Sequence, residues 1–548
     1  MKEFTPMLVT TLKGYKPSIL VKDIVAGIIV AIIALPLSIA LAIASGVGPV
    51  NGLYTAIIAG ALISIFGGSK VQISGPTAAF ATIVAGVVAA NGMEGLVIAT
   101  ILAGIILILM GIFKFGSLIK FIPYTITTGF TAGIAVTILI GQLKDFFGVV
   151  YPKGVSPIEA PEKIEAFAQN INTVNWWAVL VGAVSLLILI VWPKISKKIP
   201  ASLIAVIAGA VMVMLLPEST NVKTIEATFG ELSSNLPSLN IPKMDLKLIR
   251  TVLPDAFTIA ILAAIESLLS CVVADGMIGS KHRSNMELVA QGIGNVGSAL
   301  FGGIPATGAI ARTAANINNG GKTPIAGIVH AIVLLIILVF LMPYAALIPM
   351  PTIAAILFQV AYNMSQWRPA LRLIKTAPKS DIFVMLLTFV LTVVFDLVVA
   401  IGVGIVLACI LFMKRMSDET EVKGWKYEQT EDDSGLLADV PKSVRVFEIS
   451  GPLFFGMTDR IANITTKKYT KCLIIRMRSV PAVDATALNA LEDLCDNCIE
   501  KGITVVFSHL NEQPMQSFKK AGLFDKVGSE NFKPHIDDAL EYAKSICE

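Results

Sequence analysis

Long apolar segments restrict this chain more than any other feature of its sequence. About fourteen of them lie between residues 24 and 413, and most approach the ~20 residues that a helix needs to cross a bilayer. The chain is 55% hydrophobic and 15% charged, whereas about 25% of the residues of an average soluble domain are charged. The sequence therefore predicts a polytopic α-helical membrane protein with about fourteen transmembrane segments. The segments lie near residues 24–44, 50–66, 76–90, 93–113, 121–143, 175–192, 200–216, 254–274, 287–301, 308–318, 323–342, 344–362, 381–395 and 397–413.

Basic residues between the segments indicate the orientation. Residues 1–22 are polar and basic and do not have the pattern of a signal peptide. If these residues are cytoplasmic, an even number of spans places the basic loops at 194–198, 281–283 and 368–379 on the cytoplasmic side, as the positive-inside rule requires. We therefore expect a multi-pass protein of the cell inner (plasma) membrane, with the N- and C-termini both cytoplasmic.

Two parts of the membrane region resemble each other at an offset near 230 residues. DIVAGIIVAIIALPLSIALAIASG, from Asp23 to Gly46, matches DAFTIAILAAIESLLSCVVADG, from Asp255 to Gly276. Farther along, FGGSKVQISGPTAAF matches FGGIPATGAIART. Seven segments separate the copies, and this odd number predicts that the halves cross the membrane in opposite directions, as an inverted 7+7 repeat. The repeats cover about 23–216 and 250–416 within a transport domain at 23–416.

The segments that begin near Pro76 and Gly308 are too short to cross a bilayer. Each follows a glycine-rich stretch, GGSKVQIS or GGIPAT, that is typical of extended chain entering the membrane beside protein or a water-filled cavity. Two half-helices from opposite sides would point their N-terminal amides and positive dipole ends at one place near the midplane. The sequence thus predicts a site for a small anion between two half-helices.

Arg312 lies inside an apolar segment, where a charged side chain costs roughly 2.5 to 3.5 kcal/mol. It follows Gly308 by one helical turn, so we expect it to add positive charge to the anion site. The alternative is that it holds two helices together by pairing with Glu266 or with a backbone carbonyl.

Glu266 is the second costly residue, and the repeat aligns it with Pro36. Ser270 lies one turn later on the same helical face. We interpret Glu266 as the group that binds H⁺ or Na⁺ beside the anion, with a hydrogen-bonded structural glutamate as the alternative. His330 also lies inside a segment, where packing is favoured over a proton relay.

The composition changes after residue 416. Residues 417–440 form a charged linker, and beyond it period-2 strands alternate with amphipathic helices. This pattern predicts a small cytoplasmic α/β domain at 441–548. Cys495 and Cys498 have a CxxC spacing, but they lie on a predicted helix without a second ligand pair, which favours two helical thiols over a metal site.

Motifs of catalysis and cofactor binding are absent from the sequence. No Walker loop, nucleophile elbow or HExxH occurs, and the four histidines are dispersed, so we expect no enzyme, no cofactor and no metal. The near balance of 43 basic and 39 acidic residues does not favour nucleic-acid binding.

The repeated motifs, with AIESLLSCVVADG, GGIPATGAIARTAANINNGGKTPIAG and the later SVPAVDATAL, resemble the sulfate permease (SulP) family of anion transporters in a bacterial form. The resemblance covers nearly the whole chain. It implies a fold shared with nucleobase permeases, in which a core domain moves like an elevator against a gate domain. It also implies a homodimer and identifies the C-terminal domain as a STAS domain.

By position, the resemblance implies that the substrate lies between the two half-helices. The positions that it assigns to the substrate are Thr77, Ala78, Gly308, Ala309 and Arg312. A glutamine that is common in the first span of relatives is Leu37 here, which removes one polar contact.

The sodium site of bicarbonate-transporting relatives is only partly present. That site uses an acid at the place of Glu266, a hydroxyl at Ser270 and a hydroxyl where this chain has Ile310. Because Ile310 is apolar, we favour a proton as the coupling ion at Glu266, although backbone carbonyls could still complete a sodium site.

The STAS domain also departs from its anti-sigma-antagonist cousins, in which a phosphorylated serine follows the motif aspartate. Here Ala485 follows Asp484, and Thr486 is a weak substitute. We therefore interpret the domain first as a dimer scaffold or binding module, with a switch controlled by phosphorylation as the second interpretation.

Together these features predict a secondary active transporter of small anions of the sulfate, bicarbonate or dicarboxylate class, embedded in membrane lipid. We expect H⁺-coupled symport by an elevator mechanism. A Na⁺-coupled bicarbonate symporter and an uncoupled anion exchanger or channel remain alternatives. A nucleobase permease would share the fold, but it would be expected to lack the STAS domain.

Overall fold

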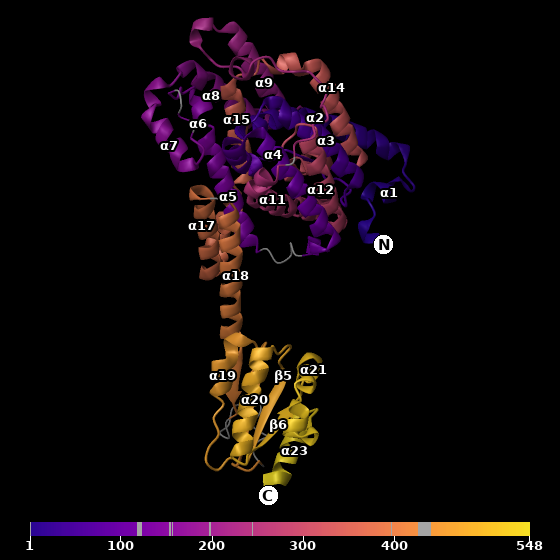
Figure 1. The fold of residues 1–548 in the computed structure, drawn as a ribbon, viewed down its shortest axis with the longest axis vertical. Helices are drawn as coiled ribbons and strands as arrows, with labels where there is room; N and C mark the ends of the chain where they lie inside the picture. Colours follow the sequence, from indigo (N-terminus) through magenta and orange to yellow (C-terminus); the bar gives the residue numbers. More distant parts are fainter. Residues whose placement is uncertain are drawn as a thin grey trace. The chain divides into compact units, whose positions relative to one another are not determined.

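The computed structural model divides the chain into two units, Met1–Ile405 and Val406–Glu548. The structure describes residues 2–117, 123–152, 155, 157–196, 199–243, 245–395, 397–425 and 440–547. The first unit is built mainly of helices, and the second contains a β-sheet with helices beside it (Figure 1). Helix α18, Leu397–Glu419, contains the division between the units.

Every apolar segment predicted from the sequence overlaps a helix of the first unit. Eight helices in the described part of the chain are long and apolar enough to cross a membrane. The chain is thus a helical membrane protein, while the total of fourteen spans stays a prediction. The longer helices are α2 Pro17–Ala44, α3 Pro49–Phe66, α4 Ala81–Ile112, α5 Tyr124–Gly141, α8 Trp176–Ile195, α9 Ala201–Leu215, α11 Leu246–Ile278, α12 Ser284–Leu300, α14 Ile325–Ala345, α15 Met350–Met364, α17 Lys379–Val394 and α18.

Shorter helices connect these elements or begin beside the candidate site. They are η1 Lys2–Phe4, α1 Met7–Leu12, η2 Ala78–Phe80, α6 Leu143–Phe147, α7 Ala160–Gln169, η4 Ile171–Thr173, η5 Glu218–Thr220, α10 Ile225–Phe229, α13 Ile310–Asn318 and α16 Trp367–Thr376. Helix α4 unites two predicted segments, and they are separated by a kink at Gly92, whose φ of 66° and ψ of −173° are not helical. Glycine tolerates this positive φ without the steric cost of a side chain.

The helices of the first unit pack in two groups. One contains α2, α3, α4, α11, α12, α13 and α14, and the other contains α5, α6, α8, α9, α15 and α17. In the first group, α4 and α12 approach closely at Gly104 and Gly292, where a Cβ on either glycine would lie within 2.7 Å of the other's carbonyl oxygen. Such small residues allow backbones to pack closely within a membrane. The two groups agree with the core and gate domains that the resemblance implied.

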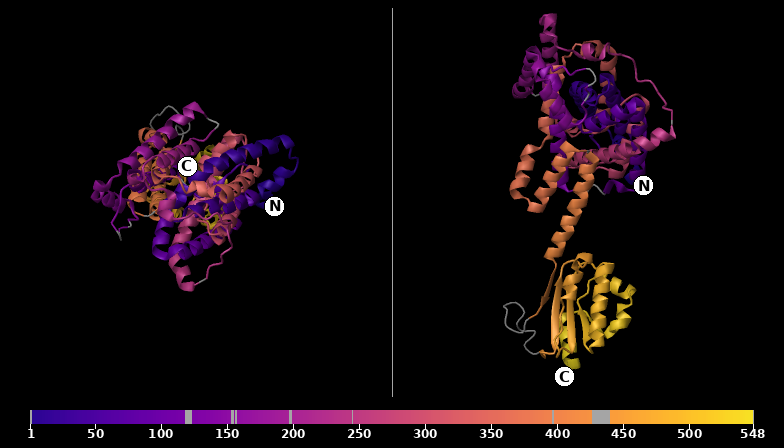
Figure 2. Two further views of the ribbon diagram at one scale, coloured as in Figure 1. Left: turned by 90° about the horizontal axis from the view of Figure 1, so that it is seen from above. Right: turned by 60° about the vertical axis from the view of Figure 1, so that its left-hand side comes forward.

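The second unit contains a five-stranded sheet with the order β3-β4-β5-β6-β7. The strands are β3 Glu421–Gly424, β4 Val444–Ser450, β5 Cys472–Ser479, β6 Thr504–Ser508 and β7 Phe532–Lys533. Strand β3 is antiparallel to β4, and the other pairs are parallel. The helices are η6 Phe455–Met457, α19 Thr458–Ala462, α20 Ala485–Glu500, α21 Glu512–Lys520, α22 Leu523–Val527, η7 Ser529–Asn531 and α23 Ile536–Cys547 (Figure 2).

Alternating side chains of the sheet enter two hydrophobic clusters. Leu473 and Ile475 belong to a cluster shared with α20 and α21, whereas Cys472 and Ile474 belong to another shared with α23. The period of two places neighbouring side chains on opposite faces, so both faces of the sheet are covered by helices. The small α/β domain predicted from the sequence is therefore present.

The start of the predicted linker is different in the structure. Residues 417–424 were assigned to it, but α18 continues to Glu419 and β3 forms at Glu421–Gly424. Strand β3 lies at the edge of the sheet, where exposed polar side chains are usual, so the charged composition concealed a strand. Residues 426–439 of the predicted linker lie outside the described residues.

Candidate functional site

The two glycine-rich stretches of the repeat pair with each other in the first unit. Strand β1, Ser74–Gly75, is antiparallel to β2, Thr307–Gly308, with Ser74 opposite Gly308 and Gly75 opposite Thr307. The N–H of Ala309 also donates to the carbonyl of Ile73 at 2.9 Å. Because the strands are antiparallel, the helices that continue from them leave in opposite directions. This geometry is what an inverted repeat requires.

Both half-helices begin directly after this pair and lack a side-chain cap. Helix η2 follows Thr77 and leads into α4, and α13 follows Ala309. The first amides of a helix have no partner within the helix, so an uncapped N-terminus retains N–H donors and a partial positive charge. Ala78 and Ala309 are buried, whereas Thr77 is half-buried and Ile310 is 40% exposed. The structure thus brings together the positions that were assigned to the substrate.

Arg312 is 3% exposed and reaches from α13 to the chain before the other half-helix. Its Nη2 donates to the carbonyl oxygen of Pro76, which realises the predicted pairing with a backbone carbonyl. Its Nη1 is buried and has no hydrogen-bond partner among the described residues. A Cβ on Gly75 would lie 2.6 Å from Nη1, so glycine leaves the space that the guanidinium occupies. Arg312 therefore adds positive charge beside both half-helices while joining them.

Glu266 lies on α11 and is half-buried. Its Oε2 accepts a hydrogen bond from Oγ1 of Thr77 at 3.1 Å. Within the described part of the chain, no hydrogen bond or ion pair connects Glu266 with Arg312. The glutamate thus contacts the residue that precedes the first half-helix and lies at the edge of the candidate anion site.

Ser270, one turn after Glu266, contacts the other half-helix. Its hydroxyl donates to Oγ1 of Thr313 at 3.3 Å, and that oxygen accepts from the N–H of Ile73 at 3.1 Å. The exposed Ile310 offers no oxygen ligand at the third position of the sodium site. The described residues contain no group of three or more histidine, cysteine or acidic side chains that could hold a metal ion.

Several functional candidates were not singled out from the sequence. Ser267 lies on the same helix, its hydroxyl is 2.6 Å from Oγ1 of Thr307, and it accepts from the N–H of Gly308 at 3.0 Å. These contacts attach α11 directly to β2. Ser267 follows Glu266 immediately, and a hydroxyl inside an apolar helix was the available signal.

Glu287 of α12 holds the stretch that leads into β1. Its Oε2 accepts from the N–H groups of Gly68 and Ser69 at 2.8 and 3.2 Å. Its Oε1 accepts from the side-chain amides of Gln72 and Gln291 at 2.7 and 2.8 Å. The fully buried carboxyl thus receives four hydrogen bonds, which positions the first crossing chain. An acidic residue at the start of an apolar segment was the signal that could have identified it.

His330 of α14 is fully buried, as a packing histidine would be, but neither ring nitrogen has a partner among the described residues. It lies beside α3, since a Cβ on Gly60 would be 3.8 Å from Nδ1. The other sequence candidate, Leu37 of α2, is half-buried.

In the second unit, Asp484 caps α20. Its Oδ1 accepts from the N–H of Ala487 at 2.8 Å, and its Oδ2 accepts from the N–H of Phe455 at 2.9 Å. Cys495 and Cys498 are buried on α20, and burial raises the pKa of both thiols, to about 12 for Cys495. They therefore behave as packed thiols and not as reactive ones.

Comparison with known proteins gives a consistent assignment. The model of the sulfate permease family matches residues 20–388, and that of the STAS domain matches residues 436–539. The chain is 40% identical over 537 residues to a putative sulfate transporter, YvdB, of Bacillus subtilis, with 96% of this chain and 98% of the relative covered. It is 32% identical over 543 residues to the bicarbonate transporter BicA of Picosynechococcus, with coverage of 95% and 94%.

Solved structures show the same fold. The chain resembles the transmembrane domain of a cyanobacterial bicarbonate transporter BicA with a TM-score of 0.62 and 32% identity, covering 70% of this chain and 97% of that one. It resembles the murine Solute Carrier 26 family member A9 anion transporter, in its inward-facing state, with a TM-score of 0.88 and 19% identity. That match covers 98% of this chain and 94% of the other, and it shows the fold alone.

Proposed function

The chain belongs to the sulfate permease family, whose members are transporters and not enzymes, and from this premise we propose that it is a secondary active transporter that takes up a small anion together with H⁺. The anion binds between η2 and α13, where uncapped amides and Arg312 supply positive charge. The relatives named for sulfate and bicarbonate support sulfate and bicarbonate as the first anions to test.

The hydrogen bond between Thr77 and Glu266 carries the proposal. A carboxylate at this place repels an incoming anion, and its protonation removes that repulsion. Two unit charges about 5 Å apart at an effective dielectric constant of about 20 repel by roughly 3 kcal/mol, which corresponds to a factor of more than 100 in affinity. Anion and proton binding then favour each other, and this reciprocal coupling is what symport requires.

We also propose that the half-helices carry the bound anion from one side of the membrane to the other. The helices of the first group hold the site, and the second group would serve as the gate against which they move as an elevator. A homodimer, with both termini in the cytoplasm, is the assembly that we expect.

Transport into proteoliposomes tests the coupling. Labelled sulfate, bicarbonate, fumarate and chloride are offered to the wild type and to Glu266→Gln under an imposed proton or sodium gradient. We expect one anion to accumulate under an inward proton gradient, and we expect the variant to lose this dependence while it still exchanges the anion. Glu94→Gln, which changes an exposed glutamate of α4, is the matched control.

If anion uptake by the wild type is the same with and without a proton or sodium gradient, symport is contradicted. An exchanger or a channel would then be the remaining function. Uptake driven by sodium alone would favour the alternative sodium-coupled bicarbonate symporter, for which the similarity to BicA is the supporting observation. The apolar and exposed Ile310 argues against that alternative.

A further inference from the structure

Helix α16 differs from the other α-helices that the structure describes in the first unit because none of its residues is buried. It has an apolar side and a basic side, and it contains no acidic residue. The apolar side consists of Trp367, Leu371 and Ile374, which are 43%, 47% and 43% exposed. Their spacing of four and three residues places them on one face of the helix.

The basic side chains of α16 follow the same spacing on the neighbouring face. They are Arg368, Arg372 and Lys375, and all three are exposed. Helices with a continuous apolar face beside lysine and arginine lie in the plane of a membrane surface and attract anionic lipids. Three positive charges without an acidic neighbour on the helix are complementary to a phosphate group.

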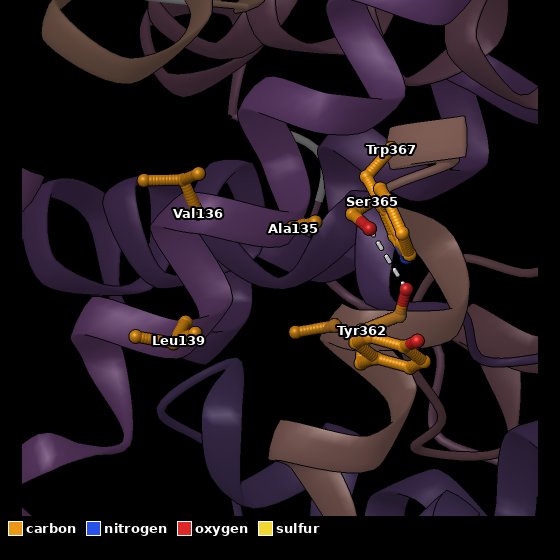
Figure 3. A pocket seen from close by; sticks show the side chains of 7 residues that line it. Ala135, Val136, Leu139, Tyr362, Ser365 and Trp367 are labelled. Carbon is orange, nitrogen blue, oxygen red and sulfur yellow. Dashed lines mark hydrogen bonds between the residues drawn. The ribbon is translucent and has the colours of Figure 1, made fainter. Parts of the chain in front are cut away.

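An open apolar groove begins at the first residue of α16. It has a volume of about 300 Å³ and is lined by Ala135 and Leu139 of α5, Tyr362 and Ser365 at the end of α15, and Trp367 (Figure 3). Figure 3 shows the α5 side chains on one side of the groove and those of Tyr362 and Trp367 on the other.

The turn between α15 and α16 positions the groove next to the basic helix. Gln366 has a left-handed conformation, with a φ of 45°, and the Ser365 hydroxyl donates to the carbonyl of Tyr362 at 2.8 Å. These two residues change the direction of the chain immediately before Trp367. The guanidinium of Arg368 lies over the ring of Trp367, with Cζ 5.2 Å from the ring centroid, so a basic side chain borders the groove as a headgroup borders an acyl chain in a lipid.

We propose that α16 and this groove form a binding site for an anionic phospholipid. The headgroup phosphate contacts Arg368 and Arg372, and one acyl chain lies in the groove between Leu139 and Trp367. A zwitterionic lipid fits the groove equally well but carries no net charge for the basic side to attract, so charge complementarity selects the anionic one. Helix α5 also packs against η2, so the bound lipid lies one helix away from the first half-helix.

Native mass spectrometry of the full-length protein tests the proposal, with phosphatidylglycerol or phosphatidylcholine added at equal concentration. We expect the wild type to retain phosphatidylglycerol at least tenfold better. The triple variant R368Q/R372Q/K375Q is expected to lose this preference. Leu139→Trp, at a side chain that is 44% exposed and so tolerates enlargement, is expected to weaken the retention of both lipids by filling the groove.

A matched control removes three exposed lysines from the second unit, K468Q/K501Q/K520Q, and is expected to behave as the wild type. Equal retention of the two lipids by the wild type would overturn the proposal, and so would an unchanged preference in R368Q/R372Q/K375Q. Retention by Leu139→Trp at the wild-type level would show that the groove holds no acyl chain. Loss of preference in the lysine control would attribute the effect to net charge and contradict a local site.

Discussion

Replacing Gly75 by alanine tests whether the position of Arg312 controls anion binding. The φ of Gly75 is not in the left-handed region, so the backbone accepts alanine, and the conflict concerns the guanidinium. The new Cβ would lie 2.6 Å from Nη1, whereas ordinary contact begins at 3.4 Å, so Arg312 must move by about 0.8 Å. This displacement breaks or bends its hydrogen bond to the carbonyl of Pro76.

The expected loss follows from the value of a charged hydrogen bond. Such a bond contributes roughly 1.5 to 3 kcal/mol, which corresponds to a ten- to hundredfold change in an affinity. We therefore expect Gly75→Ala to raise the KM for the transported anion by at least tenfold in the proteoliposome assay. The maximum rate at saturating anion should fall less, because the coupling residue Glu266 is unchanged.

The control is Gly86→Ala in α4. A Cβ there meets no atom within 4 Å, and alanine is preferred to glycine in a helix by about 1 kcal/mol, so we expect wild-type transport. Melting temperatures of both variants show whether they remain folded. A folded Gly75→Ala variant with a KM within twofold of the wild type would refute the idea that Arg312 must hold this position.

Three further predictions concern stability and thiol chemistry. Glu287→Gln places an amide nitrogen where a carboxyl oxygen now receives two hydrogen bonds, so we expect a loss of about 3 kcal/mol or more and a lower melting temperature. His330→Leu should raise the melting temperature, because it removes two buried nitrogens without a hydrogen-bond partner in the described part of the chain, worth roughly 1 kcal/mol or more. Burial raises the pKa of the Cys472 and Cys495 thiols to about 12, so both remain neutral at pH 8 and should react with a thiolate-directed reagent only after unfolding or as the pH approaches 12.

Each of these predictions has a contrary outcome. An unchanged melting temperature for Glu287→Gln would show that the carboxyl does not hold the first crossing chain. A fall in melting temperature for His330→Leu would mean that water or another polar partner satisfies the ring. Rapid labelling of Cys472 or Cys495 in the native protein at pH 8 would contradict their burial.

The sequence predicted the arrangement around the candidate site better than the contacts within it. The short segments and their meeting at one site followed from the repeat, whereas the antiparallel pairing of Ser74-Gly75 with Thr307-Gly308 is known only from the structure. The repeat could not identify Glu287 as the residue that holds the first crossing chain, because no pattern in α12 alone indicates that three donors from the stretch before β1 converge on it, beside the amide of Gln291 from α12 itself. It also could not show that His330 has no hydrogen-bond partner among the described residues, because that depends on the side chains of α2 and α3, which pack against α14.

The arrangement around the site was easier to predict than its contacts for a physical reason. Apolar length, period-2 alternation and glycine-rich breaks are local properties, and they were enough to establish a helical membrane protein with two short half-helices and an α/β domain. The partners of the buried charges are not local: Thr77 and Glu266 are 189 residues apart, and Pro76 and Arg312 are 236 residues apart. A charged group within a membrane requires a partner, and the sequence shows this requirement but not which atom is the partner. The partner atoms were decided by the packing of α11 against α13 and β2 and by the pairing of β2 with β1, and only the tertiary structure contains that information.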